Sequence, residues 1–350
     1  MKTAVVILNW NTKEYLRRWL PALLESCKGI DAGVVVADSA STDGSLEMVG
    51  EIFPQVKCIP LDENYGFTGG YNRALAQVDA EYFVLLNSDI EVPADWLAPL
   101  VEWMDSHPRC GICGPKLHGL VRERNEFIRK DSFEYAGAAG GYIDRFGYPF
   151  CRGRVLKRLE QDNGQYDSAR DVMWVSGACL MIRSSLWKQL GGLDDRFFAH
   201  MEEIDMCWRA QLAGYRVTVV PQSTVWHLGG GTLSPDSPFK LQLNYRNNLL
   251  MLGNNLPATV GKCRASARIL FRMCLDGGSA LVYLLGGKKE YFKAVVTAHR
   301  QYRKLRGSYH SSYHGDNKPK GYFGGLCILP LAAFKGKGIF DYLKEYENHN

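Results

Sequence analysis

The first ninety residues alternate short apolar, β-branched runs with segments of helical spacing. Strands are predicted at residues 2–8, 34–37, 56–59 and 82–86. Helices are predicted between them at residues 12–24, 45–49 and 71–77. Because parallel strands need crossover helices between them, this alternation indicates an α/β fold with a mostly parallel sheet and helices on both faces.

Polar residues stand where these predicted strands end. Asn9 and Asp38 close the first and second strands, and Asn87, Ser88 and Asp89 follow the fourth. Ligands of such sheets bind at the carboxyl ends of the strands, so we expect these side chains to share a binding site. Residues 66–70 are rich in glycine and predict a turn before a helix. That turn resembles a phosphate cradle, but it lacks the GxGxxG pattern and follows the third strand rather than the first.

Asp89 is a candidate metal ligand. A carboxylate at the exposed tip of a buried strand suits Mg²⁺ or Mn²⁺, which bind one or two carboxylates together with substrate phosphates. The alternative interpretation is that Asp89 caps a turn, as short Asp loops commonly do.

A second group of acids lies in the segment FFAHMEEIDMCWR at residues 197–209. Glu202, Glu203 and Asp205 begin a predicted helix over residues 203–213, where acids also favour the helix dipole without any further role. Three acids beside aromatic residues also suit general-base catalysis, since apolar surroundings raise a carboxyl pKa. Both interpretations stay open at this point.

His227 follows another predicted strand, at residues 217–220, and precedes Gly229, Gly230 and Gly231. A single histidine is more often structural than a ligand. The glycines allow a phosphate to approach the backbone closely, and histidine commonly binds metals. His227 is therefore a candidate for an extra metal ligand, and its structural interpretation stays open at this point.

The middle and the end of the chain show weaker patterns. Residues 119–170 predict an elaborated loop with a hairpin near Gly140, followed by strands at 172–175 and 179–182. Residues 241 to about 306 are helical in pattern and carry twelve Lys or Arg residues against two acids, Asp276 and Glu290. The last forty residues are partly irregular.

The local positive charge calls for an anionic partner. Arg264, Arg268 and Arg272 recur every four residues beside apolar ones, which predicts a basic helix lying on an anionic membrane surface. Two alternatives are that the helices pack on the rest of the protein with the arginines solvated, or that the charges bind an anionic glycan or nucleic acid. No base-reading motif supports nucleic acid.

The bulk composition fits a soluble, cytoplasmic protein. The 350 residues suggest one large domain with an appendage, and 46% hydrophobic and 23% charged residues are ordinary values. No run approaches the roughly 20 apolar residues of a membrane span. The N-terminus does not resemble a signal peptide, so the ten cysteines are expected to be reduced. The lone pair Cys110 and Cys113 is expected to pack beside a strand rather than bind metal.

Seven motifs in one order resemble those of family 2 glycosyltransferases, most closely the bacterial rhamnosyltransferase-like enzymes, over about residues 3–250. They are VVILNWN, VADSASTDGS, ENYGFTGGYNRAL, LLNSDIEVPADWL, WVSGACLMIR, GGLDDRFFAHMEEIDMCWR and GYRVTVVPQSTVWHLGGGT. The resemblance implies a GT-A fold, a divalent metal (Mg²⁺ or Mn²⁺) and inversion at the anomeric carbon. It also implies a nucleotide-sugar donor, dTDP-rhamnose or a UDP-sugar, and a glycan or lipid-linked acceptor in cell-surface polysaccharide synthesis.

The resemblance further implies an organisation into two parts. A catalytic domain would span residues 1–240, with a nucleotide-binding half to about residue 115 and an acceptor half from about 116. A basic, mostly helical extension would span residues 241–350.

Site residues are carried over from the same resemblance. Donor-binding roles fall on Asn9, Asn11, Asp38, Asp43, Gly66, Gly70, Asn72, Asn87 and Arg246. Asp89 and His227 would hold the metal, with Asn87 standing where the family's first metal-binding acid usually is. Glu203 takes the position of the base, where Asp is more frequent, so Glu202 and Asp205 remain alternatives.

Two other functions are compatible with an α/β sheet of this kind. A nucleotidyltransferase would carry a glycine- and basic-rich segment after the first strand, where Asn9, Trp10 and Asn11 stand instead. A non-catalytic sugar-nucleotide-binding protein would be expected to lack acids in the two acidic motifs, yet Asp89, Glu202, Glu203 and Asp205 are all present.

Overall fold

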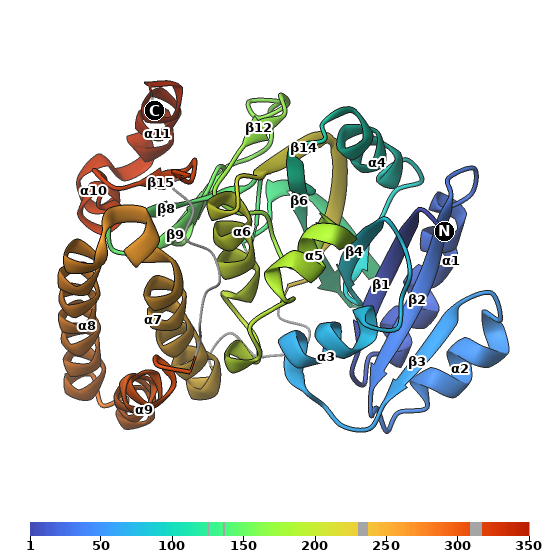
Figure 1. Cartoon of the computed structure of the whole chain (residues 1–350), viewed down its shortest axis with the longest axis horizontal. Coiled ribbons are helices and arrows are strands. Elements are labelled where there is room, and N and C mark those ends of the chain that lie inside the picture. Colours follow the sequence, from blue (N-terminus) through green and yellow to red (C-terminus); the bar gives the residue numbers. More distant parts are fainter. Residues whose placement is uncertain (125, 136, 230–236, 309–316, 350) are drawn as a thin grey trace.

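A computed structural model describes residues 1–124, 126–135, 137–229, 237–308 and 317–349. Its centre is a mixed sheet with helices on both faces (Figure 1). The strands run in the order β12-β14-β6-β13-β4-β1-β2-β3, with β5 beside β14 and β7 beside β6. Their bounds are β1 Thr3–Asn9, β2 Ala32–Ser39, β3 Lys57–Leu61, β4 Tyr82–Asn87, β5 Ile90–Glu91, β6 Cys110–Glu123, β7 Glu126–Phe133, β12 Arg170–Asp171, β13 Cys179–Arg183 and β14 Arg216–His227.

The first four strands are parallel to one another, as the sequence predicts, and their register sets the site. Asn9 on β1 pairs with Asp38 on β2, and Leu8 pairs with Asn87 on β4. β13 enters between β4 and β6 in the antiparallel direction, which makes the sheet mixed. The carboxyl ends of β1, β2 and β4 therefore lie side by side.

Two hydrophobic cores lie on the two faces of the sheet. Alternate residues of a strand point to opposite faces, so Ala4 and Val6 enter one core while Val5 and Ile7 enter the other. Helices α1 (Lys13–Ser26), α2 (Ser45–Ile52) and α4 (Leu97–Ser106) cover the second core. Helices α3 (Gly66–Leu75), α5 (Ser184–Leu190) and α6 (Glu202–Leu212) cover the first.

Two local predictions are wrong. The glycine-rich stretch at 66–70 is the first part of α3 rather than a turn before it, and Gly70 lets this helix pack against Leu8 of β1. Residues 172–175 form no strand; their apolar side chains are buried, and Trp174 makes a single bridge to Gly141. Here the apolar run reflects burial rather than strand pairing.

The segment predicted as an elaborated loop is more ordered than expected. β6 and β7 form a long hairpin, and a second sheet follows with the order β11-β10-β9-β8-β15. Its strands are β8 Gly141–Asp144, β9 Pro149–Cys151, β10 Arg154–Val155, β11 Arg158–Leu159 and β15 Tyr322–Phe323. The hairpin predicted near Gly140 is confirmed as β8 and β9.

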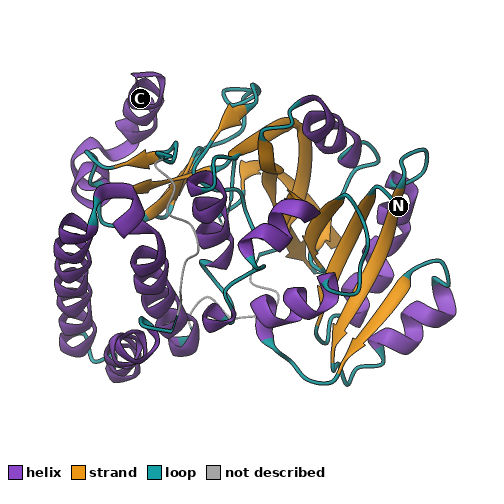
Figure 2. Ribbon diagram, viewed as in Figure 1, coloured by secondary structure: helices purple, strands orange, loops and turns teal. Residues whose placement is uncertain are grey.

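The helical pattern after residue 241 is confirmed, as Figure 2 shows for the described residues. Three helices pack together beside the sheet: α7 (Pro238–Val260), α8 (Lys262–Leu285) and α9 (Lys289–Leu305). Two shorter ones, α10 (Ile328–Lys335) and α11 (Ile339–His349), end the chain. α7 also packs on α6, so it joins the C-terminal helices to the rest of the fold. The division at residue 240 stays a prediction.

The prediction that Arg264, Arg268 and Arg272 form an exposed basic face of α8 is wrong. Arg272 is buried and forms an ion pair with Asp276, at 2.8 Å between Nε and Oδ1. Arg268 donates a hydrogen bond to the Tyr322 hydroxyl, and only Arg264 is fully exposed. The four-residue spacing correctly places these arginines along one side of a helix, but that side lies against the rest of the protein at Arg268 and Arg272. Among the described residues, no helix combines the length and apolarity that crossing a bilayer requires.

Candidate active site

A polar network joins the ends of β1 and β2. The Asn9 amide donates to Asp38 Oδ2 at 2.6 Å, and the Ser41 N–H donates to Asp38 Oδ1 at 2.8 Å. Asn11, in a left-handed conformation at φ 53°, accepts from the Thr42 N–H at 2.8 Å. The structure thus brings Asn9, Asn11 and Asp38 together, as the sequence predicts for neighbouring strand ends.

Asp43 closes the same network on the side of α1. It accepts from the backbone N–H of Lys13 at 2.9 Å and of Ser45 at 3.0 Å. Although partial burial opposes ionisation, these hydrogen bonds and the Ser45 hydroxyl hold the pKa of Asp43 below its usual value. Asp43 is therefore a fixed negative charge beside Asn11.

Asp89 and His227 meet at the tip of β4. β5 pairs with β14 so that Ile90 lies opposite His227, and the Leu228 N–H donates to the Asp89 carbonyl at 3.1 Å. His227 Nε2 lies 3.2 Å from Asp89 Oδ1, and both side chains are buried. Residues 138 positions apart in the chain are thereby held as a pair. Of the glycines after His227, Gly230 and Gly231 lie outside the described residues.

A third residue, Glu134, completes this cluster. Its Oε1 lies 3.3 Å from His227 Nδ1, so the imidazole is placed between two carboxylates. Burial alone would lower the pKa of His227, but the charges of Asp89 and Glu134 raise it to about 10. Sequence reasoning missed Glu134 because it follows β7 in a segment without periodicity or a recognisable motif.

The buried pair suits a hard divalent cation. A cation would replace the proton on His227 and would meet one carboxylate oxygen and one imidazole nitrogen. Asp89 and Glu134 contact opposite nitrogens of His227, and no three His, Cys, Asp or Glu side chains in the described part of the chain are placed to hold one ion together. The remaining ligand positions would therefore fall to substrate phosphates and water, as is usual for Mg²⁺.

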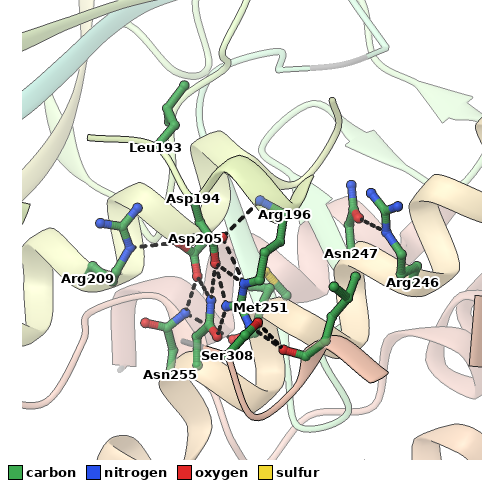
Figure 3. A network of polar contacts seen from close by, with 12 residues as sticks. Leu193, Asp194, Arg196, Asp205, Arg209, Arg246, Asn247, Met251, Asn255 and Ser308 are labelled. Atoms are coloured by element: carbon green, nitrogen blue, oxygen red, sulfur yellow. Dashed lines mark hydrogen bonds and ion pairs between the residues drawn. The ribbon is translucent and has the colours of Figure 1, made fainter. Parts of the chain in front are cut away.

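The three acids of α6 lie in different surroundings. Asp205 is fully buried and accepts from Arg209 Nε at 2.7 Å, Asn255 at 2.8 Å and Asn254 at 3.0 Å (Figure 3). Both of its oxygens are thus committed to neighbouring side chains. These contacts tie α6 to α7.

Glu202 and Glu203 each have one buried carboxylate oxygen, Oε2, without a hydrogen-bond partner in the described part of the chain. Burial raises the pKa of Glu202 well above its usual value, and the neighbouring Glu203 adds to this. Burial also raises the pKa of Glu203, to about 7. A carboxyl group such as that of Glu203 can exchange protons near neutral pH.

Glu203 packs against Gly177. Its Cβ lies so close to Gly177 that a Cβ added there would be 3.2 Å away. The next residue, Ala178, accepts a hydrogen bond from the Asn87 N–H at 2.9 Å. Gly177 therefore lets α6 approach the strand end that carries Asn87 and Asp89.

The backbone before α6 has an unusual conformation. Phe198, His200 and Met201 all have positive φ, at 63°, 72° and 72°. Such angles are unfavourable for residues with side chains and persist only where neighbours hold them. Their clustering immediately before Glu202 and Glu203 indicates that the position of these acids is held by outside contacts.

Those contacts come from α7. The Asn247 amide nitrogen donates to the carbonyl oxygens of Phe197, Ala199 and His200, at 2.9, 2.7 and 2.7 Å. Arg246 Nη2 donates to the Phe197 carbonyl at 2.8 Å. The structure thus places Arg246, predicted to bind the donor, against the loop before α6.

The remaining predicted donor residues take packing positions. Asn72 bonds Leu193 twice, donating to its carbonyl at 2.8 Å and accepting from its N–H at 2.9 Å. Gly66, at φ 69°, allows Phe198 to lie where a Cβ would be. The Thr68 N–H donates to the Phe198 carbonyl at 3.2 Å, which joins α3 to the same loop.

Solved structures with the same fold define the class of protein. The S. aureus TarS fragment 1–349 superimposes with a TM-score of 0.54 at 16% identity, over 88% of this chain and 91% of that one. GalNAc-T7, solved with UDP, GalNAc and Mn²⁺, gives a TM-score of 0.56 at 17% identity, over 73% of this chain and 48% of that one. The fold is that of the GT-A glycosyltransferases.

The chain belongs to glycosyl transferase family 2, whose model matches residues 4–187. It is 25% identical over 261 residues to an N-acetylglucosaminyl-diphospho-decaprenol L-rhamnosyltransferase of Mycobacterium tuberculosis, covering 71% of this chain and 83% of that protein. It is 22% identical over 298 residues to the low-salt glycan biosynthesis hexosyltransferase Agl10 of Haloferax volcanii, covering 84% and 88%. The resemblance predicted from the motifs is confirmed.

Proposed function

We propose that the protein transfers a sugar from a nucleotide-sugar donor, dTDP-rhamnose or a UDP-sugar, to a hydroxyl of a glycan or lipid-linked acceptor. The product would serve cell-surface polysaccharide synthesis. The name of the Mycobacterium relative supports a rhamnosyl group and a lipid-diphosphate acceptor. The observation that carries the proposal is Glu203. One of its carboxylate oxygens is buried without a hydrogen-bond partner among the described residues, burial raises its pKa to about 7, and its Cβ packs against Gly177, next to the residue that bonds Asn87 at the end of β4.

The nucleotide would bind at the ends of β1 and β2. Asp38 and Asn9 offer acceptors and donors for a base or ribose, and Asn11 and Asp43 line the next loop. Gly66 and Gly70 allow the start of α3 to approach both β1 and the loop at Phe198. The proposed role of Asn72 and Arg246 is to shape this pocket through Leu193 and Phe197, and that of Asn87 is to border the diphosphate.

Asp89 and His227 would hold Mg²⁺ or Mn²⁺. The cation, when bound, neutralises the charge that develops on the diphosphate leaving group. Glu134 would keep the His227 ring in place through its other nitrogen.

The proposed reaction is a single displacement. The acceptor hydroxyl gives its proton to Glu203, and its oxygen forms a bond to the anomeric carbon. The bond from that carbon to the diphosphate oxygen breaks, and its electron pair leaves with the nucleoside diphosphate. Attack opposite to the leaving group inverts the anomeric configuration. Asp205 is committed to Arg209 and Asn255, which favours Glu203 as the base.

The test is the release of nucleoside diphosphate from a panel of nucleotide sugars with Mn²⁺, with and without a GlcNAc-diphosphate-lipid acceptor. Acceptor-dependent release and an inverted linkage seen by NMR would support the proposal. Release of pyrophosphate from a nucleoside triphosphate and a sugar 1-phosphate would indicate a nucleotidyltransferase instead. Tight donor binding with no turnover on any acceptor would indicate a non-catalytic binding protein.

A further inference from the structure

Helix α8 exposes a row of large apolar residues to solvent. The exposed Leu, Phe, Val and Cys residues from Leu270 onward are Leu270, Phe271, Cys274, Leu281, Val282, Leu284 and Leu285, and we call them the outer face of α8. Leu285 is 80%, Val282 68% and Leu270 64% exposed. Their spacing of three and four residues places them on one side of the helix. Figure 1 shows α8 at the edge of the molecule farthest from β3.

The inner side of the same helix carries charges. Arg272 and Asp276 are buried there with Ala265 and Ala280, and Arg272 also donates to Asn248 Oδ1 at 2.6 Å. A helix on a water-facing surface normally shows the reverse, with apolar residues inward and charges outward. From Cys274 to Leu285 every exposed position is apolar or glycine, and a contiguous patch of this kind marks an interaction surface.

Basic residues border this face. Lys288 and Lys289 follow Leu285 after two glycines, and both are exposed. On α9, exposed Lys293, Arg300 and Lys304 continue at helical spacing. Only one exposed acid, Glu290, lies among the described residues of α8 and α9, because Asp276 is buried.

We propose that the outer face of α8 lies in the interfacial layer of an anionic lipid membrane, with the basic residues at its end and on α9 contacting lipid headgroups. An apolar face with basic residues beside it is the pattern of helices that lie in the plane of a membrane. At about 1.5 Å per residue, the 24 residues of α8 extend roughly 36 Å along that surface.

The charges favour a membrane over a second copy of this chain. In a twofold dimer the same patch faces itself, so Lys288 and Lys289 would approach their own counterparts or an equally basic surface. An anionic membrane surface attracts each of these residues instead. The proposal goes beyond the transfer reaction and does not depend on which sugar or acceptor is used.

The test is co-sedimentation of the full chain with sonicated vesicles that contain no acceptor. Phosphatidylglycerol–phosphatidylethanolamine vesicles are compared with phosphatidylcholine vesicles at low and high salt. We expect binding to the anionic vesicles that weakens with salt. The double variant Val282→Glu/Leu285→Glu should reduce the bound fraction by about ten-fold or more, because two apolar anchors become charged. Lys288→Glu/Lys289→Glu should reduce it by at least about five-fold for each charge.

The matched control is Ile52→Glu, an apolar residue on α2 that is 48% exposed. It should bind vesicles like the wild type, and all variants should release nucleoside diphosphate from a soluble donor equally well. Equal binding of the Val282→Glu/Leu285→Glu and Ile52→Glu variants would overturn the proposal. So would a wild-type dimer in light scattering that Val282→Glu/Leu285→Glu converts to a monomer without changing vesicle binding. Failure of donor turnover alone would count against the proposed reaction and not against the membrane surface.

Discussion

Glu134 Oε1 lies 3.3 Å from His227 Nδ1, on the opposite side of the ring from Asp89. A carboxylate in this position fixes the orientation of a metal-binding histidine and makes it a stronger ligand. We predict that Glu134→Gln weakens Mn²⁺ binding by about 10- to 100-fold, measured by electron paramagnetic resonance of free Mn²⁺ in the presence of nucleoside diphosphate. Glu126→Gln, on the exposed start of β7, is the control and should leave the affinity unchanged. Equal affinities for the two variants would remove Glu134 from the metal site.

Asp89→Asn should nearly abolish transfer and remove the metal dependence of donor binding. The amide keeps the shape of the side chain but loses the charge that holds the cation. Calorimetric titration of nucleoside diphosphate with and without Mn²⁺ measures this directly. Asp95→Asn, exposed six residues further along, should behave like the wild type. Wild-type turnover by Asp89→Asn at ordinary metal concentration would contradict the metal assignment.

Glu203→Gln should keep donor affinity and lose about 100- to 10,000-fold of kcat, the usual contribution of a positioned base. Burial raises the pKa of Glu203 to about 7, and the base must be unprotonated to act. The wild-type kcat should therefore fall as pH drops below about 7. The residual kcat of Glu203→Gln should not show this decrease. If Glu202→Gln shows this profile and Glu203→Gln does not, the base is Glu202.

Asn247→Asp should disturb the loop before α6. A carboxylate cannot donate to the three carbonyl oxygens that Asn247 now contacts, and it would repel them. We expect a loss of about 1–3 kcal/mol in the free energy of unfolding together with a fall in kcat. The control is Asn244→Asp, about one turn earlier on α7, where the side chain donates to the Lys240 carbonyl. Denaturant titration and steady-state kinetics measure the two effects. Equal stability of the two variants would contradict the inference that Asn247 stabilises the loop before α6.

Glu202→Gln should flatten the dependence of stability on pH. The folded-state pKa of Glu202 is raised, chiefly by burial, above that of the unfolded chain. The protonated form is thus favoured by folding, and its stabilising contribution is present at low pH and lost as pH rises through the folded-state pKa. At alkaline pH the variant should therefore melt at a higher temperature than the wild type. Glu51→Gln, an exposed residue on α2, should show the wild-type slope.

The sequence predicts the nucleotide-binding half well because its signals are local. Short apolar runs predict β1 to β4, and the rule that ligands bind at carboxyl ends of strands predicts that Asn9 and Asp38 lie together. They do, as a parallel pair joined by a hydrogen bond of 2.6 Å. Asp89 and His227 are residue types that suit a metal, and the structure places them 3.2 Å apart.

Other parts of the site depend on contacts between distant segments, which no periodicity reveals. Glu134 reaches His227 only because β6 pairs with β14 and with β7. Asn247 contacts the loop before α6 only because α7 packs on α6. The arginines of α8 show a further limit, because helical spacing identifies residues on one face but not whether that face is covered. Arg272 is buried and contacts Asn248 and Asp276, and the spacing alone does not predict this burial.

The hydrogen bonds from Asn247 to the backbone of residues 197–200 limit how this chain could be recombined with its relatives. A chimaera joined near residue 240 would combine one protein's loop with another protein's α7, and the three carbonyl contacts would be mismatched. Asn255 and Asp205 form a second link of the same kind. A chimaera designed to change the acceptor preference would therefore need to take residues 191–260 from a single parent. The junction would then lie before the loop at residues 197–200 rather than after it.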